Sequence, residues 1–169
     1  MESDASLSWV YNLFNHRMYT HSKDDRFDVA IKKDYDYITY MYRVFQKDDF
    51  KKVPRSIFLN SIILKISIYY LFEEKGLYPL LLLYLKYDIA KKLHARLDTL
   101  MIELSTFKSI FLIEGLNPQS ELHFTHLLEH YENHFRKVND DYLPIMLNRL
   151  NNNQIIKLSH SFSYPYKYV

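Results

Sequence analysis

Hydrophobic residues recur along this chain at intervals of three and four, which is the spacing of one face of an α-helix. One such stripe consists of Phe27, Ala30, Ile31, Ile38, Met41, Tyr42 and Phe45. Another consists of Leu82, Leu85, Ile89, Leu93, Leu97 and Leu100. The first stripe predicts a helix over about 27–45, although a local alternation in 35–42 leaves a strand as the alternative. The second predicts a helix over about 79–104, with an extension to Glu114 left open.

Both glycines stand in the same sequence context, "FEEKGLYP" (72–79) and "FLIEGLNP" (111–118). A glycine can adopt the left-handed conformation just past a helix, the next leucine can fold back on the last turn, and a proline prevents continuation. We therefore expect one helix to end at Gly76 and another at Gly115.

Two further helices are expected to open at prolines, because proline is tolerated in a first turn. Pro54 is expected to open a helix over about 54–75. Asn117 as N-cap and Pro118 are expected to open a helix that ends before Pro144. A further helix is expected around "SLSWVYNLFNHRMY" (6–19).

The fold predicted from these elements is all-α, a bundle of five or six helices with a short extended C-terminal tail. Only 2 glycines and 5 prolines occur in 169 residues, too few turn formers for a many-stranded β fold. The helical domain is expected to cover 1–150. The tail, 151–169, is expected to be extended because its sequence "QIIKLSHSFSYPYKYV" alternates aromatic and polar residues and contains Pro165.

Composition limits where the chain works and what it can bind. The chain contains no cysteine, which excludes disulfides, thiolate zinc sites and cysteine nucleophiles and favours an intracellular location. The most apolar run, 56–72, is short for a membrane span and contains Asn60 and Lys65. We expect it to be a buried helix and expect no membrane association.

The stretch "HFTHLLEHYENHFRKV" (123–138) places histidines at 123, 126, 130 and 134. On a helix they fall in one arc beside the apolar face, so we expect a polar margin of that face. The alternative is a metal-binding helical enzyme or sensor that uses His126, His130 and His134, with Glu129, His94 or His160 as a further ligand. The order HExxH is absent, and two glycines cannot supply nucleophile elbows or phosphate loops. We predict no catalytic residue and no cofactor.

A basic strip is expected on the outer side of the 79–104 helix, formed by Lys86, Lys91, Lys92 and Arg96. Such a strip is a candidate contact for nucleic acid or an acidic partner. The net charge of +2 is small for a dedicated nucleic-acid binder, so we expect any such contact to be indirect. Aromatic residues make up 17% of the chain, and at helical spacing they favour a core or a subunit interface.

Two stretches resemble the helical domain of GINS subunits, small proteins that assemble on the replicative helicase. They are "LHARLDTL" (93–100) and "LNPQSELHFTHLLEHYENHFRKVNDDYLP" (116–144). The matching positions are Arg96, Leu97, Leu116, Pro118, Phe135, Arg136, Leu143 and Pro144. Thr99 stands where the family has a basic residue. The resemblance implies a non-enzymatic scaffold in a nuclear replication complex.

The leading hypothesis is therefore a non-catalytic helical interaction subunit, GINS-like in its narrowest form, that joins protein partners in a homo- or hetero-oligomer. The metal-binding enzyme or sensor and a helical regulator that binds nucleic acid are the alternatives.

Overall fold

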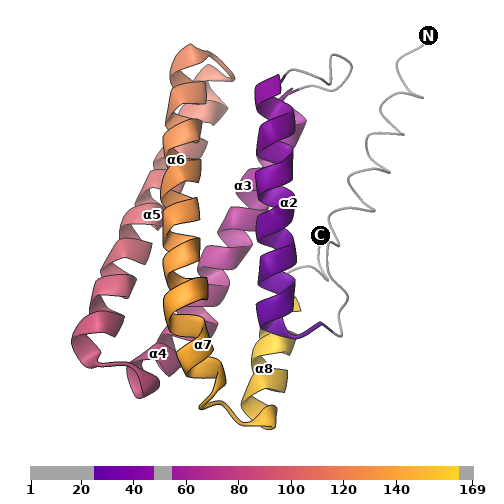
Figure 1. The fold of residues 1–169 in the computed structure, drawn as a ribbon. Coiled ribbons are helices and arrows are strands. Elements are labelled where there is room, and N and C mark those ends of the chain that lie inside the picture. Colours follow the sequence, from indigo (N-terminus) through magenta and orange to yellow (C-terminus); the bar gives the residue numbers. More distant parts are fainter. Residues whose placement is uncertain (1–24, 48–54, 164–169) are drawn as a thin grey trace.

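The computed structural model describes residues 25–47 and 55–163 (Figure 1). The helices are α2 (Phe27–Lys47), α3 (Arg55–Phe72), α4 (Tyr78–Tyr84), α5 (Tyr87–Glu114), α6 (Pro118–Arg136), α7 (Leu143–Leu147) and α8 (Asn152–Ser163), with π-helical segments η1 (Glu73–Leu77) and η2 (Lys137–Tyr142). The described ranges contain no strand, which confirms the all-α prediction. The helix expected around 6–19 lies outside them.

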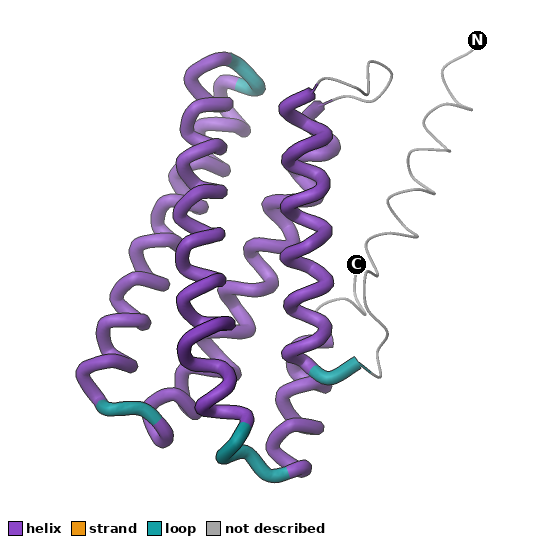
Figure 2. The backbone as a smooth tube through the Cα atoms, viewed as in Figure 1, coloured by secondary structure: helices purple, strands orange, loops and turns teal. Residues whose placement is uncertain are grey.

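Four long helices, α2, α3, α5 and α6, form an antiparallel bundle (Figures 1 and 2). Along the chain, α2 packs against α3 and α5 packs against α6, while α3 also contacts α5. The short helices α4 and α7 lie together at one end of the bundle, and α8 returns to pack on α2 and α3.

Aromatic rings fill the space where α6 faces α2 and α3. Tyr35 of α2 stacks on Phe135 with ring centroids 4.1 Å apart, and Tyr69 of α3 meets Tyr131 edge-on at 5.7 Å. Such pairs contribute about 0.5–1.5 kcal/mol each beyond the burial of their area. The aromatic surplus therefore serves the core here, as the sequence pattern predicts.

The start of α6 and the end of α5 follow the sequence prediction. Asn117 Oδ1 accepts from Ser120 N at 2.9 Å, and Ser120 Oγ accepts from Asn117 N at 2.9 Å. This capping box satisfies two backbone N–H groups at the helix start. Gly115, at φ 69°, ends α5 in a conformation that glycine adopts without steric cost.

The prediction that a helix ends at Gly76 is wrong, because α3, η1 and α4 run without interruption from Arg55 to Tyr84. Each π segment ends two residues before a proline, η1 before Pro79 and η2 before Pro144. Proline has no N–H for the regular hydrogen-bond ladder, and a π turn changes the ladder's register, so both helices bend and continue. For the same reason the helix that begins at Pro118 continues through Pro144.

Gly76 has a packing role in this continuous helix. A Cβ added there would lie 3.2 Å from the ring of Phe72 and 3.4 Å from Leu158 of α8. The missing side chain lets α8 approach closely.

The helix Arg55–Tyr84 is long and apolar enough to cross a membrane, by length and composition alone. Its most apolar window is 67% buried within the bundle. Core helices of soluble proteins have the same character.

The helix expected over 79–104 is interrupted, because Leu85 and Lys86 are extended, with ψ of 163° and 136°. We find no signal for this break in the sequence. Beyond this break, α5 runs as far as Glu114. The helix therefore includes the extension that the sequence left undecided.

The expectation of an extended tail is wrong for residues 152–163, which form α8; residues 164–169 lie outside the described ranges. Asn151 and Gln154 exchange capping hydrogen bonds of 2.9 and 3.0 Å. Phe162 is fully buried, with its ring 4.8 Å from that of Phe72. Burying such a side chain contributes about 1.5–3 kcal/mol, and Ser159 Oγ also accepts from Phe27 N at 3.0 Å. Tertiary packing therefore outweighs the local alternation.

Candidate interaction surface

Helix α5 carries two stripes of regular spacing on opposite faces. The inner stripe consists of Ala90, Leu93, Leu97, Leu100, Leu104 and Phe107, all buried. The outer stripe, which we call the outer seam, consists of Ala95, Thr99, Ile102, Thr106, Ser109 and Ile113, all exposed. The stripes are offset by two residues, about 200° around a helix at 100° per residue. The inner stripe packs on α3 and α6, so the outer seam faces away from the bundle.

Charged residues are few on α5 between Thr99 and Ile113: Glu103, whose side chain is 34% exposed, and Lys108 are both part-buried and hydrogen-bonded to His130 and Ser67. The exposed residues in this stretch are Thr99, Ile102, Ser105, Thr106, Ser109, Leu112 and Ile113. Ile102 is 67% exposed, and Leu112 and Ile113 are each 83% exposed. A helix face in contact with water usually carries charged and polar groups, so this composition is unusual for a solvated surface.

The hydroxyl groups on this face are already occupied by the helix itself. Thr99 Oγ1 donates to the Ala95 carbonyl at 3.1 Å, Thr106 Oγ1 to that of Ile102 at 2.9 Å, and Ser109 Oγ to that of Ser105 at 3.1 Å. These bonds point the hydroxyls along the helix. The face therefore presents mainly methyl and methylene groups.

The basic strip predicted from the sequence is exposed beside this face. Lys86, Lys91, Lys92 and Arg96 all lie at the α4 end of α5. Asp88 and Asp98 are exposed among them, and Asp98 lies 3.4 Å from the ring of His94. The strip is therefore of mixed charge, and the uncharged outer seam begins where it ends.

The four histidines of α6 do not share one environment. His123, His126 and His130 are exposed, as expected for a polar margin. His130 Nδ1 donates to the Glu103 carboxylate at 2.8 Å. These three histidines line a shallow hollow of about 220 Å³ between α5 and α6, together with Ile102 and Thr106 of the outer seam.

His134 is fully buried, contrary to the expected polar margin. Its Nε2 donates to both carboxylate oxygens of Glu73 at 2.8 Å, and Glu73 is only 1% exposed. Its ring meets that of Tyr70 edge-on. The sequence could have indicated this burial. On a helix, His134 lies one turn from Tyr131 and next to Phe135, and both of these residues are buried.

The arrangement does not bring His126, His130 and His134 together as metal ligands. Within the described ranges, no group of three or more histidine and carboxylate side chains is placed to hold a metal ion. His94 stacks on Tyr78 at 4.1 Å on the other side of α5, and His160 lies exposed on α8.

A second buried ion pair joins α2 and α3. Lys65 Nζ donates to Asp34 Oδ1 at 2.8 Å, and the two side chains are 1% and 4% exposed. Burial lowers the pKa of Lys65, and the attraction of Asp34 opposes this shift. The sequence shows Lys65 inside an apolar helix but does not identify its partner.

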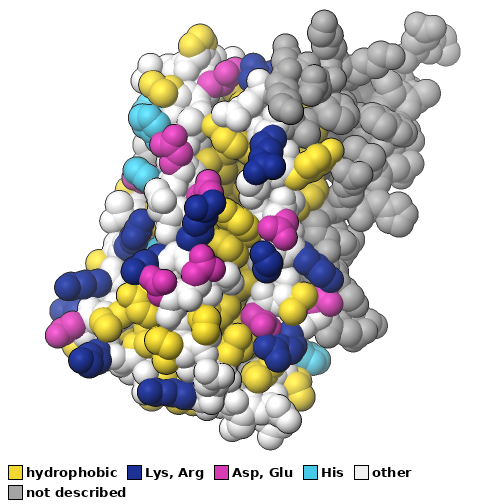
Figure 3. Space-filling model, viewed as in Figure 1, with side chains coloured by type: hydrophobic (Ala, Val, Ile, Leu, Met, Phe, Trp, Pro, Cys, Tyr) yellow, Lys and Arg dark blue, Asp and Glu magenta, His cyan; other side chains and the backbone are white. Residues whose placement is uncertain are grey.

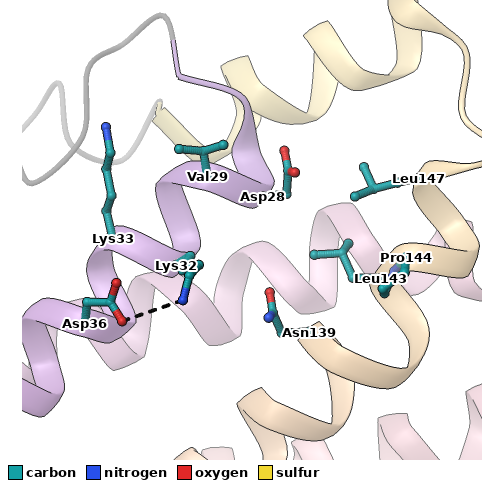
Figure 4. A pocket seen from close by; sticks show the side chains of 9 residues that line it. All are labelled: Asp28, Val29, Lys32, Lys33, Asp36, Asn139, Leu143, Pro144 and Leu147. Carbon is teal, nitrogen blue, oxygen red and sulfur yellow. Dashed lines mark ion pairs between the residues drawn. The ribbon is translucent and has the colours of Figure 1, made fainter.

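A second hollow, of about 410 Å³, lies between α2 and the η2–α7 segment. Its apolar wall is formed by Val29, Leu143, Pro144 and Leu147 (Figure 4). Its rim carries the pair Lys32–Asp36 at 3.9 Å. Figure 3 shows apolar side chains along the line where α2 and α6 meet, with charged groups on both sides. Asp28 and Lys33 also line this hollow, and they pair with Arg26 and Asp25.

Comparisons with protein-family models, with curated proteins and with solved structures gave no match. The function is therefore argued from the geometry of the molecule.

Proposed function

We propose that this chain is a non-catalytic helical interaction subunit that binds a protein partner through the outer face of α5. The observation that carries the proposal is the surface from Thr99 to Ile113, whose exposed residues are all uncharged and whose two charged residues, Glu103 and Lys108, are part-buried and hydrogen-bonded to the bundle. Large apolar patches on a soluble surface are typical of protein contacts. The exposed aliphatic groups Ile102, Leu112 and Ile113 supply the apolar centre that such contacts need.

The neighbouring charges fit the rim of an interface. Interfaces have an apolar centre surrounded by polar groups that stay in contact with water. Here Lys92 and Arg96 flank one end of the outer seam and Glu114 lies at the other. The basic strip thus belongs to the same surface, and an acidic group of a partner is the contact that suits it.

A GINS-like scaffold is the narrower form of this proposal. Of the positions that carry that resemblance, Leu97, Phe135 and Leu143 are buried, so packing alone accounts for their apolar character. Arg96 and Arg136 are exposed, and they are the matched residues able to contact a partner. The GINS-like role stays a prediction.

The test compares capture of partners by matched variants of the full chain in its native cells. Leu112→Glu with Ile113→Glu places charge in the proposed interface, whereas Ile156→Glu places charge on α8. Ile156 is 55% exposed, so neither change is expected to alter stability by more than about 0.5 kcal/mol.

We expect the wild-type chain and Ile156→Glu to retain a stoichiometric protein partner, another copy of the chain included, and the double variant to lose it. Circular dichroism checks that all three remain folded. Equal recovery with the double variant, or no protein partner for the wild-type chain, contradicts the proposal.

A further inference from the structure

We infer that the outer seam of α5 pairs with the same seam of a second copy of this chain, with the two helices antiparallel. This inference rests on the proposed function, because it assigns the partner of the same face. It is argued from the register of the seam and from the charges beside it.

The outer seam has the spacing of a two-helix contact. Its members, Ala95, Thr99, Ile102, Thr106, Ser109 and Ile113, are separated by four, three, four, three and four residues. This alternation repeats every seven residues, which keeps a seam facing a partner helix along its length. The seam spans about 27 Å at 1.5 Å per residue.

The order of side-chain sizes along the seam is self-complementary in the antiparallel direction. If two copies of α5 cross at position 104, Ala95 of each faces Ile113 of the other. Thr99 then faces Ser109, and Ile102 faces Thr106. A large residue meets a small one at both ends and on each side of the centre, so two identical surfaces interdigitate.

The flanking charges also favour the antiparallel direction. In the same register, Glu114 of one copy falls between Lys92 and Arg96 of the other, on the same flank. Each basic residue is offset from it by two positions, about 3 Å along the axis. In a parallel pair the two-fold axis runs along the helices, so Glu114 of one copy would lie on the opposite flank from Lys92 and Arg96 of the other and about 27–33 Å away along the axis, and this contact could not form.

Glu103 is the one acidic group near the centre of this arrangement. Its carboxylate is turned toward His130 of its own chain, with an oxygen 2.8 Å from Nδ1. The hydrogen bond holds the carboxylate toward α6 and away from the second copy.

The absence of cysteine makes the register directly measurable. The full chain is prepared as Thr99→Cys and, separately, as Ser109→Cys, and the two are oxidised alone and as a mixture. A disulfide needs Cα atoms closer than about 7 Å. In the proposed pair, position 99 of one copy lies beside position 109 of the other and about 15 Å from its own counterpart.

We expect the mixture to give a disulfide-linked dimer in at least about tenfold higher yield than either variant alone. Analytical ultracentrifugation of the wild-type chain is expected to show a dimer. Leu112→Glu with Ile113→Glu is expected to weaken it more than about tenfold, or about 1.4 kcal/mol.

The possible failures are distinguishable. Cross-linking of Thr99→Cys with itself overturns the antiparallel register. A chain that stays monomeric at all concentrations, but captures a different protein that Leu112→Glu with Ile113→Glu releases, overturns self-pairing and leaves the proposed function standing. A dimer that the same double variant does not weaken overturns both.

Discussion

The interior between α2, α3 and α6 and the outer face of α5 reverse the usual relation between polarity and burial. The interior holds two pairs of ionisable groups, Asp34–Lys65 and Glu73–His134, each residue at most 3% exposed. On the outer face, the exposed residues from Thr99 to Ile113 are all uncharged, and Glu103 and Lys108 are part-buried and hydrogen-bonded to the bundle. Buried charge and exposed apolar surface are both costly unless something compensates them.

The two regions differ in where that compensation is found. The members of each pair lie 2.8 Å apart within the chain, whereas His134 Nδ1 and the hydroxyls of Tyr69 and Tyr70 are buried without a hydrogen-bond partner in the described part of the chain. The outer face bonds its hydroxyls within the helix, while Ile102, Leu112 and Ile113 stay 67–83% exposed to solvent among the described residues. The comparison leads to two predictions: the charges of the interior are compensated within one chain, and the outer face is covered by another molecule, as proposed above.

The strongest test of the buried pairs is to remove one member of a pair. Lys65→Met leaves Asp34 buried without its ammonium partner, and we expect a loss of about 3–5 kcal/mol in the free energy of unfolding. Urea denaturation measures it. Lys32→Met, in an exposed pair with Asp36, is the matched control and should cost less than about 1 kcal/mol.

A second variant separates lost charge pairing from lost packing. Lys65→Met with Asp34→Leu replaces both charges by apolar groups, and it should recover most of the stability that the single variant loses. If the double variant is as unstable as Lys65→Met, the pair is not the reason for the loss.

The two faces of α5 give the next comparison. Leu97 is 1% exposed, and Leu97→Ala should cost about 2–5 kcal/mol because it leaves a cavity. Ser109→Ala on the outer seam should change stability by no more than about 0.5 kcal/mol. Thermal unfolding at concentrations too low for association measures both. Equal effects would mean that the two faces do not differ as the structure implies.

Alkaline pH tests the interior through its tyrosines. Burial raises the pKa of Tyr69, Tyr70 and Tyr131 above the ordinary value of 10.0. The folded state therefore keeps these protons while the unfolded chain releases them, so stability is full below pH 10 and falls as pH rises above it. Lys65 acts in the opposite direction below pH 10.5, because its pKa is lowered.

The contribution of one ring is isolated by Tyr70→Phe. Above pH 10 the variant should lose stability more slowly than the wild-type chain, by about 1.4 kcal/mol per pH unit. Lys65 is the same in both proteins, so its effect cancels. Urea denaturation at several alkaline pH values measures the two slopes, and parallel slopes would contradict the buried state of Tyr70.

The sequence predicts those parts of the fold that depend on local pattern. The apolar stripe of α2 and the cap at Asn117 are of this kind. It fails where the outcome depends on distant contacts. Gly76 looks like a helix end, but Leu158, far along the chain, packs against it. The α8 segment has an Asn151–Gln154 capping signal that the alternating pattern obscures.

The candidate surface is predictable only in part, for a similar reason. The basic strip is visible in the sequence, and the 3.5-residue spacing from Ala95 to Ile113 could have revealed the outer seam. However, threonine and serine are not counted as apolar when hydrophobic stripes are sought in a sequence. The inner stripe, which is rich in leucine, is therefore recognised, and the outer seam is not. The pairing of His134 with Glu73 joins positions 61 residues apart, and no local spacing reports such a contact.

The smallest expected effect tests the direction in which the outer faces meet. Glu114→Lys should weaken dimerisation by about 0.2–1 kcal/mol, because an exposed ion pair is replaced by repulsion from Lys92 and Arg96 of the second copy. Combining it with Lys92→Glu and Arg96→Glu should restore the affinity. Sedimentation equilibrium at low ionic strength measures both variants, and added salt should reduce the difference. In a parallel pair Glu114 would lie about 27–33 Å along the axis from Lys92 and Arg96 of the second copy, so no weakening and recovery through this contact is expected there, and recovery by the combined variant specifically supports the antiparallel contact.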